Sequence, residues 1–337
     1  MKKLFSVLIV SLMVIGMLVG CGPKATTTSQ TAGEVKEPKD TLIALSMPTT
    51  QNDFMAMVVK QLGDKFKAAG YKFDSASADG SAQKQIEQIE NFITMGASEI
   101  IVMAVEPTSL TDVCKKAMDK GVKIYAFTTN TGSYTAFMGS DELKVGESIA
   151  SLASKWVDKA YANAGDGTVN VVLFTYTGNP EAAARSKGLA SIAEKNKKIK
   201  VVKTVEVENS TDAALKAAEN LAQTNPETNV ILCYNGIQAI GVNSYVMSPG
   251  SSVKDKSKFA VFGSELTAEA TKAIEDSKDN KAVFRGTAQV GGDLMAAFDK
   301  LVKASVSMLK NESFLKDDIA PVDEIDIDNL AQFKQNK

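Results

Sequence analysis

The sequence contains no histidine, the side chain that most often serves as a general base or metal ligand near neutral pH. It also lacks a phosphate-binding Gly-Lys-Ser/Thr loop, and the pair Gly291 and Gly292 alone is too weak a signal for a nucleotide site. The net charge is only -2, without a long basic run, and Lys and Arg supply most of the affinity for nucleic acid. We therefore expect no nucleic-acid partner, no metal, no cofactor and no enzymatic activity.

Cysteine is scarce as well, with three residues in the chain. Cys233 follows an apolar Val-Ile-Leu run that is typical of a buried strand, and Cys114 lies within a helical pattern. These two could pair in an exported protein, but their spacing matches no disulfide framework. We expect both to be free and buried.

The acidic stretch from Asp323 to Asp328 could suggest a calcium loop. It lacks the central glycine and the terminal bidentate glutamate of that motif. We interpret it as a solvated acidic strand.

The N-terminal segment is strongly apolar: Met-Lys-Lys precedes an apolar run over residues 4–19. This pattern is typical of an export signal and is too short for a comfortable membrane span. Residues 18–21, Leu-Val-Gly-Cys, resemble the bacterial lipobox, in which the cysteine is diacylated and becomes the mature N-terminus. The resemblance implies a signal peptide over 1–20 and a lipid anchor at Cys21; an ordinary cleaved signal with an incidental cysteine is the alternative.

A polar segment rich in Thr, Ser, Lys, Pro and Gly follows, and we interpret residues 21–40 as a lipidated cysteine with a flexible tether. The remaining roughly 300 residues can form one large core or two medium cores. The whole chain is 44% hydrophobic and 23% charged, as in an ordinary globular protein.

Apolar strand-like runs alternate with amphipathic helical patterns along this remainder, which indicates an α/β fold with helices on both faces of parallel sheets. The expected strands in the first half are Thr41–Met47, Tyr71–Ser77, Glu99–Ala104 and Val122–Phe127. Those in the second half are Thr168–Phe174, Lys200–Glu206, Asn229–Tyr234, Phe259–Gly263 and Ala282–Arg285, with one more in the acidic tail. The repetition predicts two Rossmann-like, doubly wound lobes with a cleft between them.

Several separated segments, taken in order, resemble the type I periplasmic sugar-binding family, of which the ribose-binding protein is the familiar member. They lie at residues 96–124, 178–188, 225–241 and 287–292, and the resemblance extends from Thr41 to about Asp328. It implies ligand binding in the interlobe cleft, at the carboxyl ends of the strands, where open parallel sheets bind ligands in general.

The family's three-strand hinge implies lobes that are discontinuous in sequence. The N-terminal lobe is expected to comprise residues 41–141 plus 290–319, and the C-terminal lobe 142–289 plus 320–337. The crossings would fall near Asp141, Gln289 and Ala320, and closure around a ligand would be a hinge motion.

The resemblance also implies ligand contacts, namely Asn52, Phe54, Arg185, Asn235 and Gln289. Amides and a guanidinium can hold sugar hydroxyls, and an aromatic ring can stack on a sugar face. Structural alternatives remain for each: core packing for the phenylalanine, a helix cap for the first asparagine, an exposed helical arginine, and loop amides that satisfy backbone groups.

The sequence departs from the family at three positions where aspartates are common, which here are Thr128, Gly236 and Ser264. Strong charge-assisted acceptors for sugar hydroxyls are therefore missing or moved. The position of Thr128 at a strand end keeps it among the expected ligand contacts.

Glu265 and Asp53 could supply displaced carboxylates, although both could equally be surface charges. If neither faces the cleft, Arg185 lacks a counter-charge within the protein, and this would favour a ligand that carries negative charge.

Three hypotheses follow. The first is a monomeric, lipid-anchored protein on the extracytoplasmic face of the cell membrane that captures a small polar ligand, expected to be a sugar, for an ABC-type permease. The second is presentation of the closed complex to a membrane receptor. The third, an enzyme with Glu265 and Asp53 as paired carboxylates, is the one that we disfavour.

Overall fold

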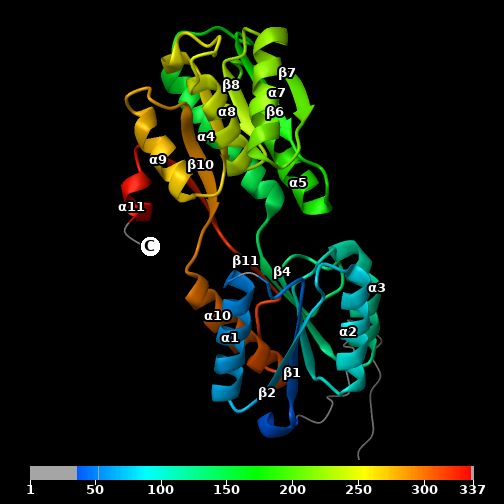
Figure 1. Ribbon diagram of the computed structural model, residues 1–337. Coiled ribbons are helices and arrows are strands. Elements are labelled where there is room, and N and C mark those ends of the chain that lie inside the picture. Colours follow the sequence, from blue (N-terminus) through cyan, green and yellow to red (C-terminus); the bar gives the residue numbers. More distant parts are fainter. Residues whose placement is uncertain (1–35, 52, 335–337) are drawn as a thin grey trace, which may run out of the picture. The chain divides into compact units, whose positions relative to one another are not determined.

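The computed structural model describes residues 36–51 and 53–334, without the side chains of Asp53 and Phe54 (Figure 1). The described chain opens with a 3-10 turn, η1 (Pro38–Asp40), in the stretch that the sequence analysis assigned to the end of the tether. The remaining elements form two six-stranded sheets, each covered by helices.

The first sheet has the strand order β11-β5-β4-β3-β1-β2, with every neighbouring pair parallel. Its strands are β1 (Leu42–Met47), β2 (Lys72–Ser77), β3 (Glu99–Val102), β4 (Lys123–Thr128), β5 (Ala136–Gly139) and β11 (Asp317–Ile319). Side chains alternate between its two faces, so that Ile43, Leu45 and Met47 pack on one side while Ala44 packs on the other.

Four helices cover this first sheet. α1 (Asp53–Ala68) and α10 (Leu294–Leu309) pack on one face, and α2 (Ala82–Thr94) and α3 (Pro107–Asp119) on the opposite one. Gly121 stands at a φ of +85° just beyond α3, in the left-handed conformation that ends many helices.

The second sheet has the order β12-β10-β9-β8-β6-β7. Its strands are β6 (Val169–Thr175), β7 (Ile199–Glu206), β8 (Val230–Cys233), β9 (Ala260–Ser264), β10 (Phe284–Val290) and β12 (Val322–Asp326). All neighbours are parallel except β12, which runs antiparallel to β10.

Helices also cover both faces of the second sheet. One face packs against α4 (Glu142–Ala160) and α6 (Ile192–Lys195), and the other against α7 (Thr211–Thr224), α8 (Gly236–Met247) and α9 (Ala268–Ser277). α5 (Pro180–Leu189) packs beside α4, a further short 3-10 turn is η2 (Lys256–Lys258), and α11 (Leu330–Lys334) follows β12.

The chain passes between the two sheets three times. The crossings lie between β5 and α4, between β10 and α10, and between β11 and β12, which correspond to residues 139–142, 290–294 and 319–322. The predicted α/β class, with two doubly wound lobes joined by three crossings, is confirmed.

The details differ in three places. The prediction of a strand at Ala282–Arg285 was wrong in its bounds, because β10 runs on through the polar residues that follow Gly286. β5 was missed because four residues give little periodic signal, and the expected single tail strand is in fact two strands, β11 and β12.

Both cysteines of the described chain, Cys114 and Cys233, are free and buried, which confirms the prediction. Burial raises the pKa of the Cys114 thiol to about 11. None of the helices in residues 36–51 and 53–334 combines the length and the apolar content that crossing a membrane requires.

Candidate functional site

Arg185 lies at the centre of a polar cluster beside the crossings. It belongs to α5, whose N-terminus is capped by Asn179, the side chain of which accepts a hydrogen bond from the Ala182 backbone at 2.8 Å. The Arg185 side chain is only 12% exposed, so its charge requires partners within the protein.

Glu142 is the principal partner of Arg185. Its Oε2 lies 2.7 Å from Nε and 2.6 Å from Nη2 of the guanidinium. The hydroxyl of Ser140 donates to the other carboxylate oxygen at 2.6 Å. Glu142 is the first residue of α4, directly after the crossing from β5, so the ion pair joins this crossing to α5.

The other end of the guanidinium reaches the carboxyl ends of β8 and β9. Nη1 donates to the Ser264 hydroxyl at 2.8 Å and lies 3.5 Å from the Tyr234 carbonyl and 3.7 Å from Oε1 of Glu265. The guanidinium carbon also stands 4.8 Å from the centre of the Tyr234 ring, within the range of a cation–π contact. Arg185 on α5 therefore links the start of α4 to the carboxyl ends of β8 and β9.

The charges of this cluster shift one another's protonation. Burial lowers the pKa of Arg185, but Glu142 and Glu265 raise it, and the net shift is upward. Burial raises the pKa of Glu265, against the opposing effect of Arg185. The guanidinium stays charged and is paired with Glu142 and, at a longer distance, with Glu265.

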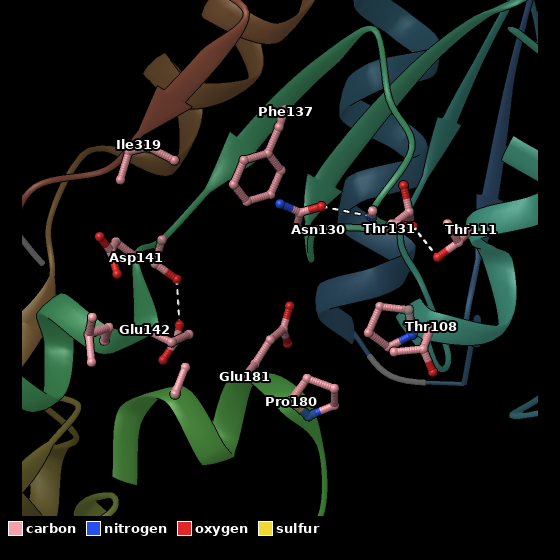
Figure 2. A pocket seen from close by; sticks show the side chains of 15 residues that line it. Thr108, Thr111, Asn130, Thr131, Phe137, Asp141, Glu142, Pro180, Glu181 and Ile319 are labelled. Carbon is pink, nitrogen blue, oxygen red and sulfur yellow. Dashed lines mark hydrogen bonds between the residues drawn. The ribbon is translucent and has the colours of Figure 1, made fainter. Parts of the chain in front are cut away.

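A cavity of about 440 Å³ adjoins the cluster (Figure 2). It is lined from the side of the first sheet by residues that include Thr108, Asn130 and Phe137, and from the side of the second sheet by Glu142 and Glu181. The Glu181 carboxylate points into it. The volume is that of a small-molecule site, and hydroxyl, amide, carboxylate and aromatic groups converge there.

Glu181 is a cavity-lining carboxylate that was not among the expected ligand contacts. Burial is the main cause that raises the pKa of Glu181, and the nearby Glu142 raises it further. A hydrogen bond from the backbone of Asn130 lowers it. Glu142 was also not among the expected contacts, because it follows β5, the strand that was missed. A run of polar residues directly after a strand end, here Ser140, Asp141 and Glu142, is the signal that could have located it.

Two of the expected ligand contacts already serve the backbone. Asn235 is 3% exposed and caps α8, accepting from the Gln238 backbone at 3.0 Å, while its amide donates to Asn209 at 2.7 Å. Gln289 accepts from the backbone of Leu266 at 2.6 Å and donates to the carbonyl of Val290 at 2.8 Å. These are the backbone roles that the sequence analysis left open, and ligand contact by either remains a prediction.

Thr128 and Glu265 occupy matching places in the two lobes. Thr128 ends β4 and Glu265 directly follows β9, the fourth strand of its own doubly wound unit. Both have a left-handed backbone, with φ of 68° and 76°, which is costly for any residue with a side chain and above all for a β-branched one. Backbone strain of this kind clusters at binding sites.

Cys21 and Asn52 lie outside the described residues, as do the side chains of Phe54 and Asp53. Among the residues that the structure does describe, no group of three or more Cys, Asp and Glu could hold a metal ion.

Two doubly wound parallel sheets, three crossings and a cavity lined from both sheets define a bilobal α/β protein that binds a small molecule between its lobes. Residues 43–305 match the family model described as a periplasmic binding protein domain. The chain belongs to this family, which places it outside the cytoplasm.

Individual relatives agree with the family match. The D-allose-binding periplasmic protein of Escherichia coli is 25% identical over 259 residues, which cover 74% of this chain and 80% of that protein. The multiple sugar-binding periplasmic receptor ChvE of Rhizobium radiobacter is 32% identical over 139 residues, 39% of this chain and 37% of the receptor. An ABC transporter solute-binding protein from Bacillus halodurans with bound myo-inositol shares the fold, with a TM-score of 0.69 and 20% identity over 89% of this chain and 99% of that one.

Proposed function

We propose that this protein captures a small, polar, sugar-like ligand between its lobes and delivers it to an ABC-type uptake permease. The observation that supports this most directly is the cavity of about 440 Å³ beside the Arg185 cluster, lined from both sheets. The names of the allose-binding and inositol-bound relatives favour a sugar or a polyol. The relatives are binding and transport proteins, and we propose binding without turnover for this chain as well.

The remaining parts of the proposal come from the sequence. Cys21 anchors the mature, monomeric protein by its acyl chains to the outer face of the cell membrane, and the segment that follows it acts as the tether. The lobes comprise residues 41–141 plus 290–319 and residues 142–289 plus 320–337. Asn52, Phe54, Thr128, Arg185, Asn235, Glu265 and Gln289 contribute to the site.

Thermal unfolding of the full-length protein in detergent, across monosaccharides and polyols, tests the capture function. A ligand at one hundred times its Kd stabilises the folded state by about 2.7 kcal/mol, and we expect a midpoint shift of several degrees with at least one neutral compound. Arg185→Ala should abolish the shift because it removes donors at the strand ends.

Lys187→Ala, an exposed residue on the same helix, serves as the matched control and should leave the shift intact. If no sugar or polyol moves the midpoint of the wild-type protein, the proposed ligand class is wrong.

A receptor role is the second candidate, and the similarity to the receptor ChvE favours it. In this case the ligand-bound protein would associate with a membrane receptor. Crosslinking in cells with and without ligand, followed by identification of the captured membrane protein, separates a permease from a receptor.

A further inference from the structure

The charge of Arg185 is already balanced inside the protein. Glu142 contacts the guanidinium at 2.6 and 2.7 Å and is itself only 17% exposed, and Glu265 approaches Nη1 at 3.7 Å. Glu181 and Asp141 add two more carboxylates around the adjoining cavity, and none of the residues that line this cavity is Lys or Arg. The ionisable side chains that line the cavity are therefore all acidic, although an arginine stands beside it.

The hydrogen-bonding capacity of Arg185 is largely used as well. A guanidinium has five N–H donors. Glu142 takes those of Nε and one of Nη2, and Nη1 donates to the Ser264 hydroxyl at 2.8 Å and to the Tyr234 carbonyl at 3.5 Å. Glu142 thus occupies the Nε and Nη2 side of the guanidinium, and the Nη1 donors of the other side serve groups of the protein. The N–H that is left on Nη2 suits a single hydrogen bond to a hydroxyl oxygen.

Glu142 is held firmly in this role. Ser140 donates to its Oε1 at 2.6 Å, and the carboxylate follows Asp141, whose side chain caps α4 by accepting from the Lys144 backbone at 3.0 Å. It cannot leave Arg185 without breaking the Ser140 bond in a largely buried place, where unpaired charge is costly.

We propose that Glu142 sets the charge specificity of the binding site, by neutralising Arg185 and restricting the ligand to uncharged polyhydroxyl compounds. This inference rests on the proposed function and narrows its ligand class. Because Arg185 has internal counter-charges in Glu142 and Glu265, it does not require an anionic ligand. Uronic acids and sugar phosphates would meet no lysine or arginine in the cavity lining, and they would face the acidic side chains of Glu181 and Asp141 there.

Matched pairs of probes test the proposal by isothermal titration: D-glucose with D-glucuronate, D-galactose with D-galacturonate, and D-allose with its 6-phosphate. The wild-type protein should prefer the neutral member of any pair that it binds by at least about tenfold. Glu142→Gln should lower this preference by about tenfold, because it frees the guanidinium fork and removes one negative charge. A merely structural defect would weaken both members alike and leave their ratio unchanged.

Glu147→Gln makes the same change in charge on α4, at a residue paired with Lys144, and should leave the ratio as it is in the wild type. Glu265→Gln, whose side chain is half exposed, provides a second variant should Glu142→Gln fail to fold, with a smaller shift in the same direction.

The outcomes separate the two proposals. A wild-type protein that binds none of the probes contradicts the proposed function. One that binds neutral and acidic members equally overturns the inference alone, and so do variants of Glu142 and Glu265 that both keep the full preference of the wild type.

Discussion

Among single residues, Glu99 is the one Asp, Glu, Lys or Arg of the described chain that is buried. It is the first residue of β3, is fully buried, and faces α10, where the Ser305 hydroxyl donates to its Oε1 at 2.6 Å. Its Oε2 has no hydrogen-bond partner within the described chain. Burial raises the pKa of Glu99 from 4.5 to about 8, so the carboxyl is protonated at neutral pH.

This shift predicts a pH-dependent stability. Because the pKa in the folded state lies above that of the unfolded chain, the stabilisation is complete below about pH 4.5 and is lost as the pH rises through 8. Glu99→Gln should remove this slope, which is at most about 1.4 kcal/mol per pH unit, in urea unfolding between pH 5 and 8.5.

Glu87→Gln, at an exposed position on α2, should keep the slope of the wild-type protein. Equal slopes for wild type and Glu99→Gln would show that the buried carboxyl does not titrate in this window.

The polar site residues show that a match to a family position does not by itself identify the partners of a side chain. Arg185 was singled out by its match to a family position, and the structure gives it the central place in the cluster. Asn235 and Gln289 were singled out in the same way, but both amides serve the backbone. An amide can meet a backbone group or a ligand equally well, and only its position in space shows which partners lie within reach.

At the scale of secondary structure elements, the contact between α4 and α5 positions Arg185 and Glu142. The two helices meet at Gly146 and Gly188, where an added Cβ would lie 2.1 Å from the Arg185 carbonyl and 2.3 Å from the Leu143 carbonyl, respectively. Glycine at both positions therefore lets the backbones approach closely enough for the ion pair to form.

Gly146→Ala should separate these helices. We expect a loss of about 1–3 kcal/mol in the free energy of unfolding from overpacking, together with weaker ligand binding because Arg185 moves from the strand ends. Chemical unfolding and titration with the ligand found by thermal shift measure the two effects.

Gly165→Ala is the matched control, because a Cβ there would have its nearest neighbour at 3.8 Å. If Gly146→Ala proves as stable and as tightly binding as Gly165→Ala, the close approach of α4 and α5 does not determine the site.

At the scale of the whole molecule, three crossings join the two sheets, and each is only a few residues long. Short segments at the ends of strands and helices can absorb the backbone rotations of a hinge. The site draws residues from both sides of these crossings, so a ligand that contacts both sides favours the closed arrangement.

We accordingly expect ligand to reduce the radius of gyration in small-angle X-ray scattering. The reduction should vanish in Arg185→Ala at the same ligand concentration, and it should not depend on protein concentration if the protein is a monomer. A radius that stays constant at saturating ligand would argue for a binding mode without hinge closure.

The sequence by itself determined the class of fold, the order of most elements and the family. Strand and helix periodicity is a local property of the chain, and a parallel sheet covered on both faces leaves near-continuous apolar runs such as residues 100–103. The polar end of β10 lacks such a run, and its extent is set by pairing with β9 and β12, while β5 is too short to show a period.

Only the tertiary structure decided how charge is arranged at the site. Glu142 and Arg185 are 43 residues apart, and Glu265 lies a further 80 residues along the chain. No local pattern shows that these three side chains meet, because their contact depends on how α4, α5 and the end of β9 pack. The fold could thus be inferred from spacing along the chain, whereas the balance of charge around Arg185 depends on distances through space.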